Sequence, residues 1–201
     1  MVSPIISTLL TSIAGSFIVS PLAVVLRGSQ KLLSGENGQK KKVAVLGCGT
    51  IGNLCAQYMT LKGQAVTVFD RNAAKLSKMP DLHIQNYTTI SGLDRFDYLI
   101  EATGKIEVLQ QVLSESKTGA KILLLGLTYS AMNFNFENVV CFDKTIIGSV
   151  GSSRQDFLMA IKTYTQLDLS DLTKDVFPLN AYPEAWDQHK KGQVPKAIIE
   201  V

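Results

Sequence analysis

The chain has 201 residues, of which 46% are apolar and 18% are charged, and its net charge at pH 7 is +3. This length and composition predict one soluble globular domain with a single hydrophobic core. The small net charge argues against a nucleic-acid-binding protein, which would concentrate basic residues on one face. The three cysteines and two histidines have no metal-ligand spacing, and an odd cysteine count favours free thiols in a reducing, cytoplasmic compartment.

The N-terminal stretch from residue 2 to 26 has no charged side chain, so a membrane span or an export signal has to be considered. Prolines and a glycine interrupt the stretch, and no basic residue precedes it. Ser3-Pro4 and Ser20-Pro21 are each typical of a helix N-cap followed by proline at the first helical position. We therefore expect two helices before Ser34, with a membrane role as the alternative.

From residue 43 onward, short apolar runs alternate with stretches of helical periodicity. We expect strands at 42–47, 64–70, 83–85, 96–103, 120–126, 144–150 and 196–201, and helices at 50–63, 106–117, 154–166 and 182–192. Continuous apolar strands separated by helices predict a parallel sheet that is buried on both faces. The sequence thus predicts a doubly wound α/β domain over residues 41–201, preceded by a helical arm and linker over residues 1–40.

Three glycines, Gly47, Gly49 and Gly52, stand where the first of these strands ends and the next helix begins. Gly47 allows a tight turn, Gly49 leaves room for a pyrophosphate, and Gly52 lets the helix pack closely against the strand. The backbone amides at the helix start favour an anion without any lysine. Because a strand precedes the motif and a helix follows it, the sequence predicts a Rossmann-type sheet of about six strands that binds a dinucleotide.

Asp70 ends the next strand, where a carboxylate can accept hydrogen bonds from both hydroxyls of an adenosine ribose. The same carboxylate would repel the 2′-phosphate of NADP, so Asp70 favours NAD as the cofactor, with NADP as the less favoured alternative. Arg71 beside it weakens this discrimination. The alternative role for Asp70 is that of an ordinary turn residue.

Six segments of the chain occur in the order and spacing of a known family: SPLAVVLRGSQ, VAVLGCGTIGNLCAQYMTLKG, VTVFDRNAAKL, FDYLIEATG, AKILLLGL and YPEAWDQHKKGQVPKAIIEV. Over residues 20–201 the chain resembles the C-terminal, cofactor-binding domain of the medium-chain dehydrogenase/reductase superfamily, in particular the zinc-type alcohol, polyol and threonine dehydrogenases. The resemblance implies further contacts with the dinucleotide, from Thr50 and Ile51 at the pyrophosphate, Arg71 and Lys75 at the adenosine, Ala102, Thr103 and Gly104 along the cleft, Leu125, Gly126 and Leu127 at the nicotinamide, and Lys196 near the pyrophosphate. Surface roles for the two lysines, and core packing for the two leucines, are the alternatives.

The catalytic domain of this family precedes the cofactor domain and carries the zinc ligands, and the resemblance implies that this chain starts after it. Ser20 stands where the family usually has a zinc-ligating glutamate, so we expect no zinc in this chain and assign no catalytic residue. The first interpretation is the NAD-binding domain of an alcohol or polyol dehydrogenase, which needs a separate catalytic domain or subunit for hydride transfer. The second is a non-catalytic module that senses NAD and NADH. A methyltransferase would share the glycine loop, but the full set of parallel strands argues against it.

Residues 132–140 fall where the family pairs two sheets edge to edge across a dimer. Met132, Phe134 and Phe136 alternate with polar residues, as in a half-buried strand. An apolar edge of this kind is prone to aggregation unless it is covered. The resemblance therefore implies a homodimer, in which a second copy of the chain covers this edge.

Overall fold

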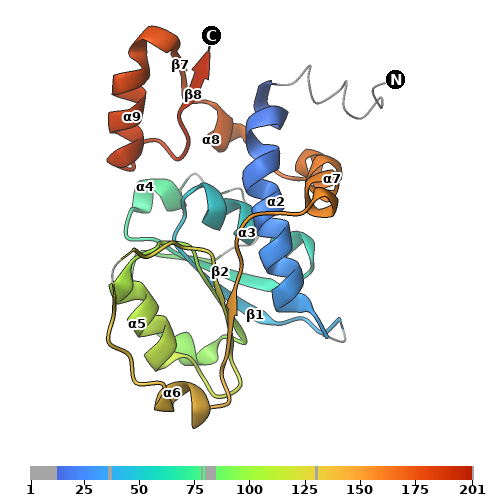
Figure 1. Ribbon diagram of the computed structural model, residues 1–201, viewed down its shortest axis with the longest axis vertical. Coiled ribbons are helices and arrows are strands. Elements are labelled where there is room, and N and C mark those ends of the chain that lie inside the picture. The colour runs from blue at the N-terminus through green and yellow to red at the C-terminus, as the bar shows by residue number, and fades with distance from the viewer. Residues whose placement is uncertain (1–12, 36–37, 78, 80–84, 130, 201) are drawn as a thin grey trace.

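A computed structural model describes residues 13–35, 38–77, 79, 85–129 and 131–200. Six parallel strands form one sheet, in the order β3-β2-β1-β4-β5-β6. Figure 1 labels β1 and β2 of this sheet. They are β1 (Lys42–Leu46), β2 (Ala65–Phe69), β3 (Gln85–Tyr87), β4 (Tyr98–Glu101), β5 (Lys121–Leu124) and β6 (Thr145–Gly148). The chain changes its direction of winding between β1 and β4, which is the topological switch point of such a sheet. This arrangement confirms the predicted Rossmann-type, doubly wound α/β fold.

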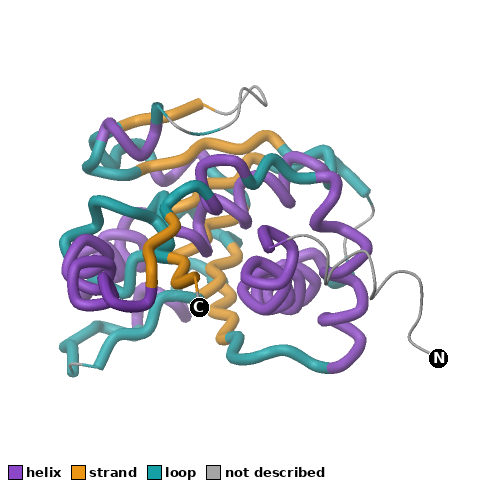
Figure 2. The backbone as a smooth tube through the Cα atoms, turned by 90° about the horizontal axis from the view of Figure 1, so that it is seen from above, coloured by secondary structure: helices purple, strands orange, loops and turns teal. Residues whose placement is uncertain are grey.

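Helices cover both faces of the sheet (Figure 2). On one face lie α2 (Ile13–Leu33), α3 (Thr50–Leu61) and α7 (Arg154–Thr163), and on the other lies α5 (Ile106–Glu115). The strands contribute to both cores, because alternate residues point to opposite faces. In β1, Val43 and Val45 belong to the core under α2 and α3, whereas Ala44 and Leu46 belong to the core under α5. Burial on both faces explains why the sequences of β1, β2, β4 and β5 are continuous apolar runs.

The N-terminal helix α2 runs without a break through the position where we expected a second helix to begin. Pro21 lies inside α2, and Ser20 is exposed within the same helix. Proline removes one backbone hydrogen bond and is disfavoured in a helix interior. Burial of apolar side chains on both sides of the proline outweighs this effect, since Ile18 and Leu22 are both 0% exposed. The predicted N-cap at Ser20 is therefore wrong, and the one at Ser3 lies outside the described residues.

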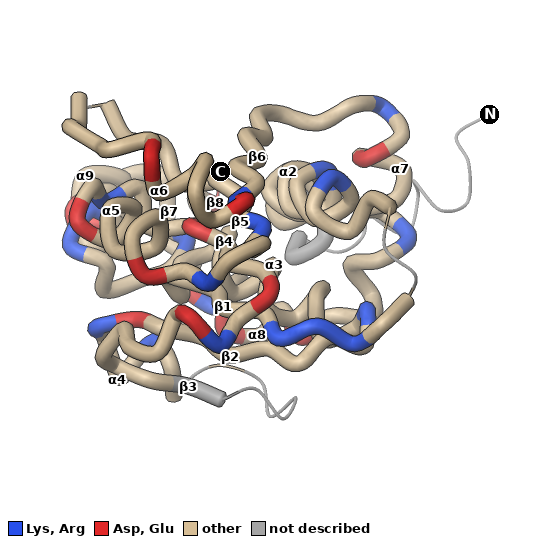
Figure 3. Tube along the Cα trace, turned by 90° about the horizontal axis from the view of Figure 1, so that it is seen from below, with Lys and Arg blue, Asp and Glu red and all other residues tan. Residues whose placement is uncertain are grey.

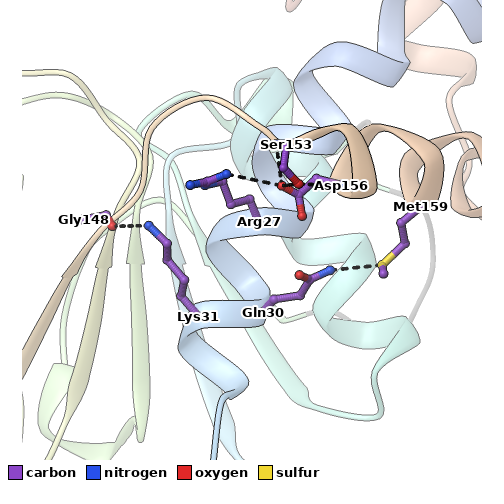
Figure 4. Close-up of polar contacts among 7 residues, drawn as sticks. All are labelled: Arg27, Gln30, Lys31, Gly148, Ser153, Asp156 and Met159. Atoms are coloured by element: carbon purple, nitrogen blue, oxygen red, sulfur yellow. Dashed lines mark hydrogen bonds and ion pairs between the residues drawn. The ribbon is translucent and has the colours of Figure 1, made fainter.

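Polar contacts also connect α2 with β6 and α7 (Figure 4). The Nζ atom of Lys31 donates to the carbonyl oxygen of Gly148 at 2.9 Å, and an Nη atom of Arg27 lies 3.6 Å from a carboxylate oxygen of Asp156. The helix therefore packs into the same core as the sheet. Within the described residues, no helix combines the length and the apolar character that crossing a membrane requires.

Residues 131–135 form no strand, so the half-buried edge strand expected in this segment is absent from the single chain. Met132 and Phe134 still pack against the core under α5, but Phe136 is 68% exposed. The side chain of Asn135 accepts a hydrogen bond from the Glu137 amide at 2.9 Å, and the short helix α6 (Glu137–Val140) follows. The backbone N–H and C=O groups of a strand form hydrogen bonds with a neighbouring strand, and the described part of the chain has no strand beside this segment. Pairing with a second chain stays a prediction.

The C-terminal part forms a second, smaller sheet. Strands β7 (Val176–Pro178) and β8 (Ile198–Glu200) pair in parallel, and α9 (Tyr182–Lys190) lies between them in the chain. The strand expected at 196–201 is therefore present, but it pairs outside the main sheet. The sequence pattern does not predict β7, because three residues are too few for a periodic signal.

Candidate functional site

The loop that joins β1 to α3 lies at the switch point of the sheet. Gly47 has a backbone φ of +99°, a conformation that side-chain-bearing residues rarely adopt. A Cβ atom on Gly52 would lie 1.8 Å from the carbonyl oxygen of Gly47, so the helix approaches the strand too closely for any side chain. A Cβ atom on Gly49, in contrast, would meet no atom within 4 Å. The first and third glycines therefore serve the fold, while the second leaves open space beside the N-terminus of α3.

Asp70 directly follows β2, and its carboxylate contacts this glycine loop. The Oδ2 atom accepts a hydrogen bond from the Cys48 amide at 2.7 Å, and Oδ1 accepts one from the Asn72 amide at 2.8 Å. Asn72 in turn caps the short helix α4 (Ala73–Leu76) by accepting from the Ala74 amide. The backbone thus fixes the orientation of the carboxylate, and each of its oxygens keeps a lone pair for a further donor.

A cavity of about 540 Å³ lies at the carboxyl ends of β1, β2 and β4. Seven predicted site residues line it: Gly47, Gly49, Asp70, Arg71, Lys75, Ala102 and Thr103. The other lining residues could not be predicted, because no recognisable motif contains them. Phe69 ends β2, and the rest follow β3 and β4: Thr88, Thr89, Ile90, Lys105, Val108 and Gln111. Three cations and one carboxylate line the cavity, which favours an anionic ligand. Over the rest of the molecule, basic and acidic residues are interspersed (Figure 3).

A second cavity, of about 400 Å³, adjoins the first, because Gly49, Lys75 and Ala102 line both. It extends from the N-terminus of α3 to the C-terminal segment, and its further lining consists of Pro21, Thr50, Ile51, His189, Gly192, Val194, Pro195 and Lys196. The hydroxyl of Thr50 donates to the carbonyl oxygen of Pro195 at 2.8 Å, which holds the C-terminal segment against the glycine loop. The structure thus brings the predicted Lys196 close to the predicted Thr50 and Ile51.

The predicted residues Leu125, Gly126 and Leu127 follow β5 and line neither cavity. Leu125 packs against the core, and Leu127 is 67% exposed. Their loop lies against Gly104, where a Cβ atom would come within 2.7 Å of the Leu127 carbonyl oxygen. Gly104 and Leu127 are therefore in contact with each other, beside the cavities rather than inside them.

Glu101 is a buried carboxylate that no sequence motif indicates. It ends β4 and is 1% exposed. Its Oε1 atom accepts hydrogen bonds from the amides of Thr103 and Gly104 at 2.6 and 3.1 Å, and from the Thr103 hydroxyl. The sequence signal that could have identified Glu101 is an acidic residue at the end of an otherwise apolar strand. A glutamate at such a position is seldom fully buried unless its oxygens accept specific hydrogen bonds.

Cys48 belongs to the glycine loop, but it is a buried packing residue. It is 3% exposed, and burial, reinforced by Asp70 and opposed by Lys75, raises the pKa of its thiol to about 12. Burial also raises the pKa of Cys55. Neither thiol ionises near neutral pH, so neither can act as a nucleophile there. In the part of the chain that the structure describes, no three His, Cys, Asp or Glu side chains are grouped so that they could hold a metal ion.

The six-stranded parallel sheet, with a glycine loop at its switch point, defines a Rossmann-type domain. Residues 13–201 match the family described as glucose dehydrogenase C-terminus, and the chain belongs to this family. It is thus a member of the medium-chain dehydrogenase/reductase superfamily and corresponds to the C-terminal, cofactor-binding part of zinc-type dehydrogenases.

Curated relatives and solved structures agree with this assignment. L-threonine 3-dehydrogenase from Cutibacterium acnes is 28% identical over 174 residues, which cover 78% of this chain and 50% of the relative. Sorbitol dehydrogenase from Bombyx mori is 26% identical, over 91% of this chain and 57% of the relative. Glucose dehydrogenase from Haloferax mediterranei, solved in complex with NADP, zinc and gluconolactone, gives a TM-score of 0.75 at 20% identity, over 92% of this chain and 58% of that one. The chain therefore spans about half the length of the curated relatives that it matches.

Proposed function

We propose that this chain binds NAD in preference to NADP, as the cofactor-binding part of a dehydrogenase that acts on an alcohol or polyol. The observation that carries the proposal is the placement of Asp70 at the wall of the 540 Å³ cavity, with its carboxylate fixed by the Cys48 and Asn72 amides. A ribose with two free hydroxyls can donate to this carboxylate. A 2′-phosphate would instead meet an anion at close range.

The rest of the dinucleotide would lie along the two adjoining cavities. The free amides at the N-terminus of α3, next to Thr50 and Ile51, would hold the pyrophosphate, because they carry a partial positive charge and Gly49 leaves the approach open. Lys75 and Lys196, which both line the second cavity, would offset the phosphate charges. The nicotinamide would then lie toward the loops that follow β4 and β5.

The proposed reaction is hydride transfer between the alcohol carbon of the substrate and the nicotinamide, with the substrate and zinc-binding groups supplied by a separate domain or subunit. The relatives support this reaction class, since they include threonine, sorbitol and glucose dehydrogenases. The Haloferax enzyme was solved with NADP, so the choice of NAD for this chain depends on Asp70 and not on the family. The three free cysteines, Cys48, Cys55 and Cys141, support a reducing, cytoplasmic location.

Separate titrations of the purified chain with NADH and with NADPH test the cofactor choice. The readout is energy transfer from Trp186, the single tryptophan, which lines a neighbouring cavity together with Lys196. We expect NADH to bind at least about tenfold more tightly than NADPH, because one charge–charge contact at a partly exposed site is worth more than ~1.4 kcal/mol. Equal, weak binding of both coenzymes would contradict the proposal.

The Asp70→Ala variant tests whether this carboxylate is the cause of the preference. Without it, the affinity for NADH should fall and that for NADPH should rise, so that the ratio of the two approaches one. The matched control is Asp94→Ala, which removes an exposed carboxylate that does not line the site. It should leave both affinities unchanged.

A further inference from the structure

Glu101 occupies the point where the loops that follow β4 and β5 meet. Its backbone carbonyl oxygen accepts hydrogen bonds from the amides of both Leu125 and Gly126, each at 2.9 Å. A Cβ atom on Gly126 would lie 2.3 Å from the Oε2 atom of Glu101, so the Glu101 side chain runs directly against the backbone of the β5 loop. On its other side, Oε1 holds the amides of Thr103 and Gly104 in the β4 loop.

The carboxylate of Glu101 is stabilised by dipoles rather than by an opposite charge. Within the described ranges, its hydrogen-bond partners are backbone amides and the Thr103 hydroxyl, and the carboxylate accepts each of these bonds. Among the described residues, no lysine or arginine forms an ion pair with it. Amide and hydroxyl donors can keep a buried carboxylate in place without cancelling its net charge. Neighbouring groups therefore experience the field of this charge with little screening by water.

The strand order fixes which half of a bound dinucleotide this field would reach. Asp70, at the end of β2, marks the adenosine half in the proposed function. Strands β4 and β5 lie on the opposite side of β1 from β2. The nicotinamide half therefore falls toward the two loops that Glu101 holds.

We propose that Glu101 is a positioning residue that also biases the bound cofactor toward its oxidised form; this inference rests on the proposed function. The nicotinamide ring carries a positive charge in NAD⁺ and none in NADH. A fixed, buried negative charge nearby stabilises the cationic ring and has little effect on the neutral one. Glu101 thus raises the affinity for NAD⁺ relative to that for NADH.

The Glu101→Gln variant removes the charge but keeps a side chain of the same shape, with an oxygen that can still accept from the Thr103 and Gly104 amides. We expect the affinity for NAD⁺ to fall about fivefold relative to that for NADH. Both affinities are measured by Trp186 energy transfer for NADH and by competition against NADH for NAD⁺. Glu115→Gln makes the same change on the exposed C-terminal end of α5 and should leave the ratio unchanged.

The Glu101→Asp variant separates the charge from the hydrogen bonds. It keeps the carboxylate but shortens its reach, so we expect weaker binding of both coenzymes with the wild-type ratio. An unchanged ratio in Glu101→Gln, or an equal change of the ratio in Glu101→Asp, would overturn the inference. Failure of the wild-type chain to bind NADH would instead count against the proposed function.

ADP-ribose separates the contribution of the nicotinamide ring from that of the adenosine half. Because it lacks the ring, its affinity is the common reference for NAD⁺ and NADH. In Glu101→Gln, the gain in affinity of NAD⁺ over ADP-ribose should fall about fivefold, while the gain of NADH over ADP-ribose and the affinity for ADP-ribose itself should stay as in the wild type. A fall of all three affinities by one common factor would overturn the inference.

Discussion

The glycines of the loop between β1 and α3 belong to one motif, but their surroundings differ in how much space they leave for a side chain. Gly52 faces the backbone of Gly47, and a Cβ atom there would overlap the carbonyl oxygen at 1.8 Å. Because that obstacle is backbone and not a flexible side chain, we expect Gly52→Ala to lower the free energy of unfolding by more than ~3 kcal/mol. Urea denaturation checks this value. A variant within ~1 kcal/mol of the wild type would show that α3 can move away from β1.

Gly49 gives the matched contrast within the same loop. Its backbone φ of −78° suits alanine, and a Cβ atom there would meet nothing within 4 Å. We expect Gly49→Ala to keep the wild-type free energy of unfolding within ~0.5 kcal/mol. Its methyl group would occupy the proposed path of the pyrophosphate, so the affinity for NADH should fall about tenfold or more, corresponding to ~1.4 kcal/mol. Unchanged NADH affinity would place the pyrophosphate elsewhere.

Residue-level prediction from the sequence succeeds where a motif fixes a backbone shape. Gly47 and Gly52 could be assigned their structural roles because a tight turn and a close helix–strand approach exclude side chains. Glu101 and Gln111 could not be found in this way, because their places depend on which strands and helices become neighbours in space. Asp70 is intermediate: its position after β2 was predictable, but its hydrogen bond with the Cys48 amide was not.

At the scale of elements, the start of α7 shows how a helix terminus is fixed by charge and hydrogen bonds. Ser153 and Asp156 form a reciprocal capping box, and Arg27 of α2 lies beside the Asp156 carboxylate (Figure 4). Burial alone would raise the pKa of Asp156, but the hydrogen bonds from Ser153 and the charge of Arg27 together lower it below its usual value. The carboxylate therefore stabilises the fold above the pKa of an unfolded aspartate, and this contribution is lost as the pH falls through the lowered pKa.

The Asp156→Asn variant tests this pH dependence. We expect it to lower the free energy of unfolding by about 1–2 kcal/mol at pH 7, because a charge-assisted cap is replaced by a neutral one. The difference from the wild type should begin to shrink below pH ~4, where an unfolded aspartate becomes protonated, and it should vanish only as the pH falls through the lowered pKa of Asp156. Urea denaturation at pH 7 and at pH 3 measures both values. Asp94→Asn, at an exposed position, should show no such change.

Helices and strands were predictable from the sequence where a single periodic pattern determines them. The predictions failed where tertiary contacts determine the structure. Strands β1, β2, β4 and β5 follow their apolar runs, since most of their residues are buried on both faces of the sheet. Ser20-Pro21 resembles a helix start, yet packing of α2 against α3 and α7 carries the helix through the proline. The alternation of apolar and polar residues over 132–136 is typical of a strand. Within the described residues of one chain, however, no strand lies beside this segment to pair with it.

For the molecule as a whole, we retain as a proposal the homodimer predicted through residues 132–140, and we propose that the neighbouring edge strand of the main sheet takes part in it. Strand β6 is the edge strand, and Ile146 on it is 37% exposed. The segments that flank β6 expose Val140 at 76% and Val150 at 79%. Such an edge is a site where a second copy of the chain could pair and exclude water.

Sedimentation velocity of the Ile146→Lys variant tests the proposed pairing. A lysine on the edge strand would place two like charges in the interface of a symmetric dimer, so we expect a shift from dimer to monomer. Leu179→Lys, an equivalent change at an exposed position outside the main sheet, is the control and should leave the dimer intact. A wild-type chain that sediments as a monomer would contradict the proposal.

The hydrogen bond between the Thr50 hydroxyl and the Pro195 carbonyl joins positions that are 145 residues apart. A ribosome that adds about 5–20 residues per second needs roughly 7 to 30 seconds to synthesise that stretch. During synthesis, the glycine loop and Asp70 therefore emerge while the far wall of the second cavity does not yet exist. The second cavity can bind a ligand only after Lys196 has been synthesised. The nascent chain should therefore bind the ligand more weakly than the finished protein does.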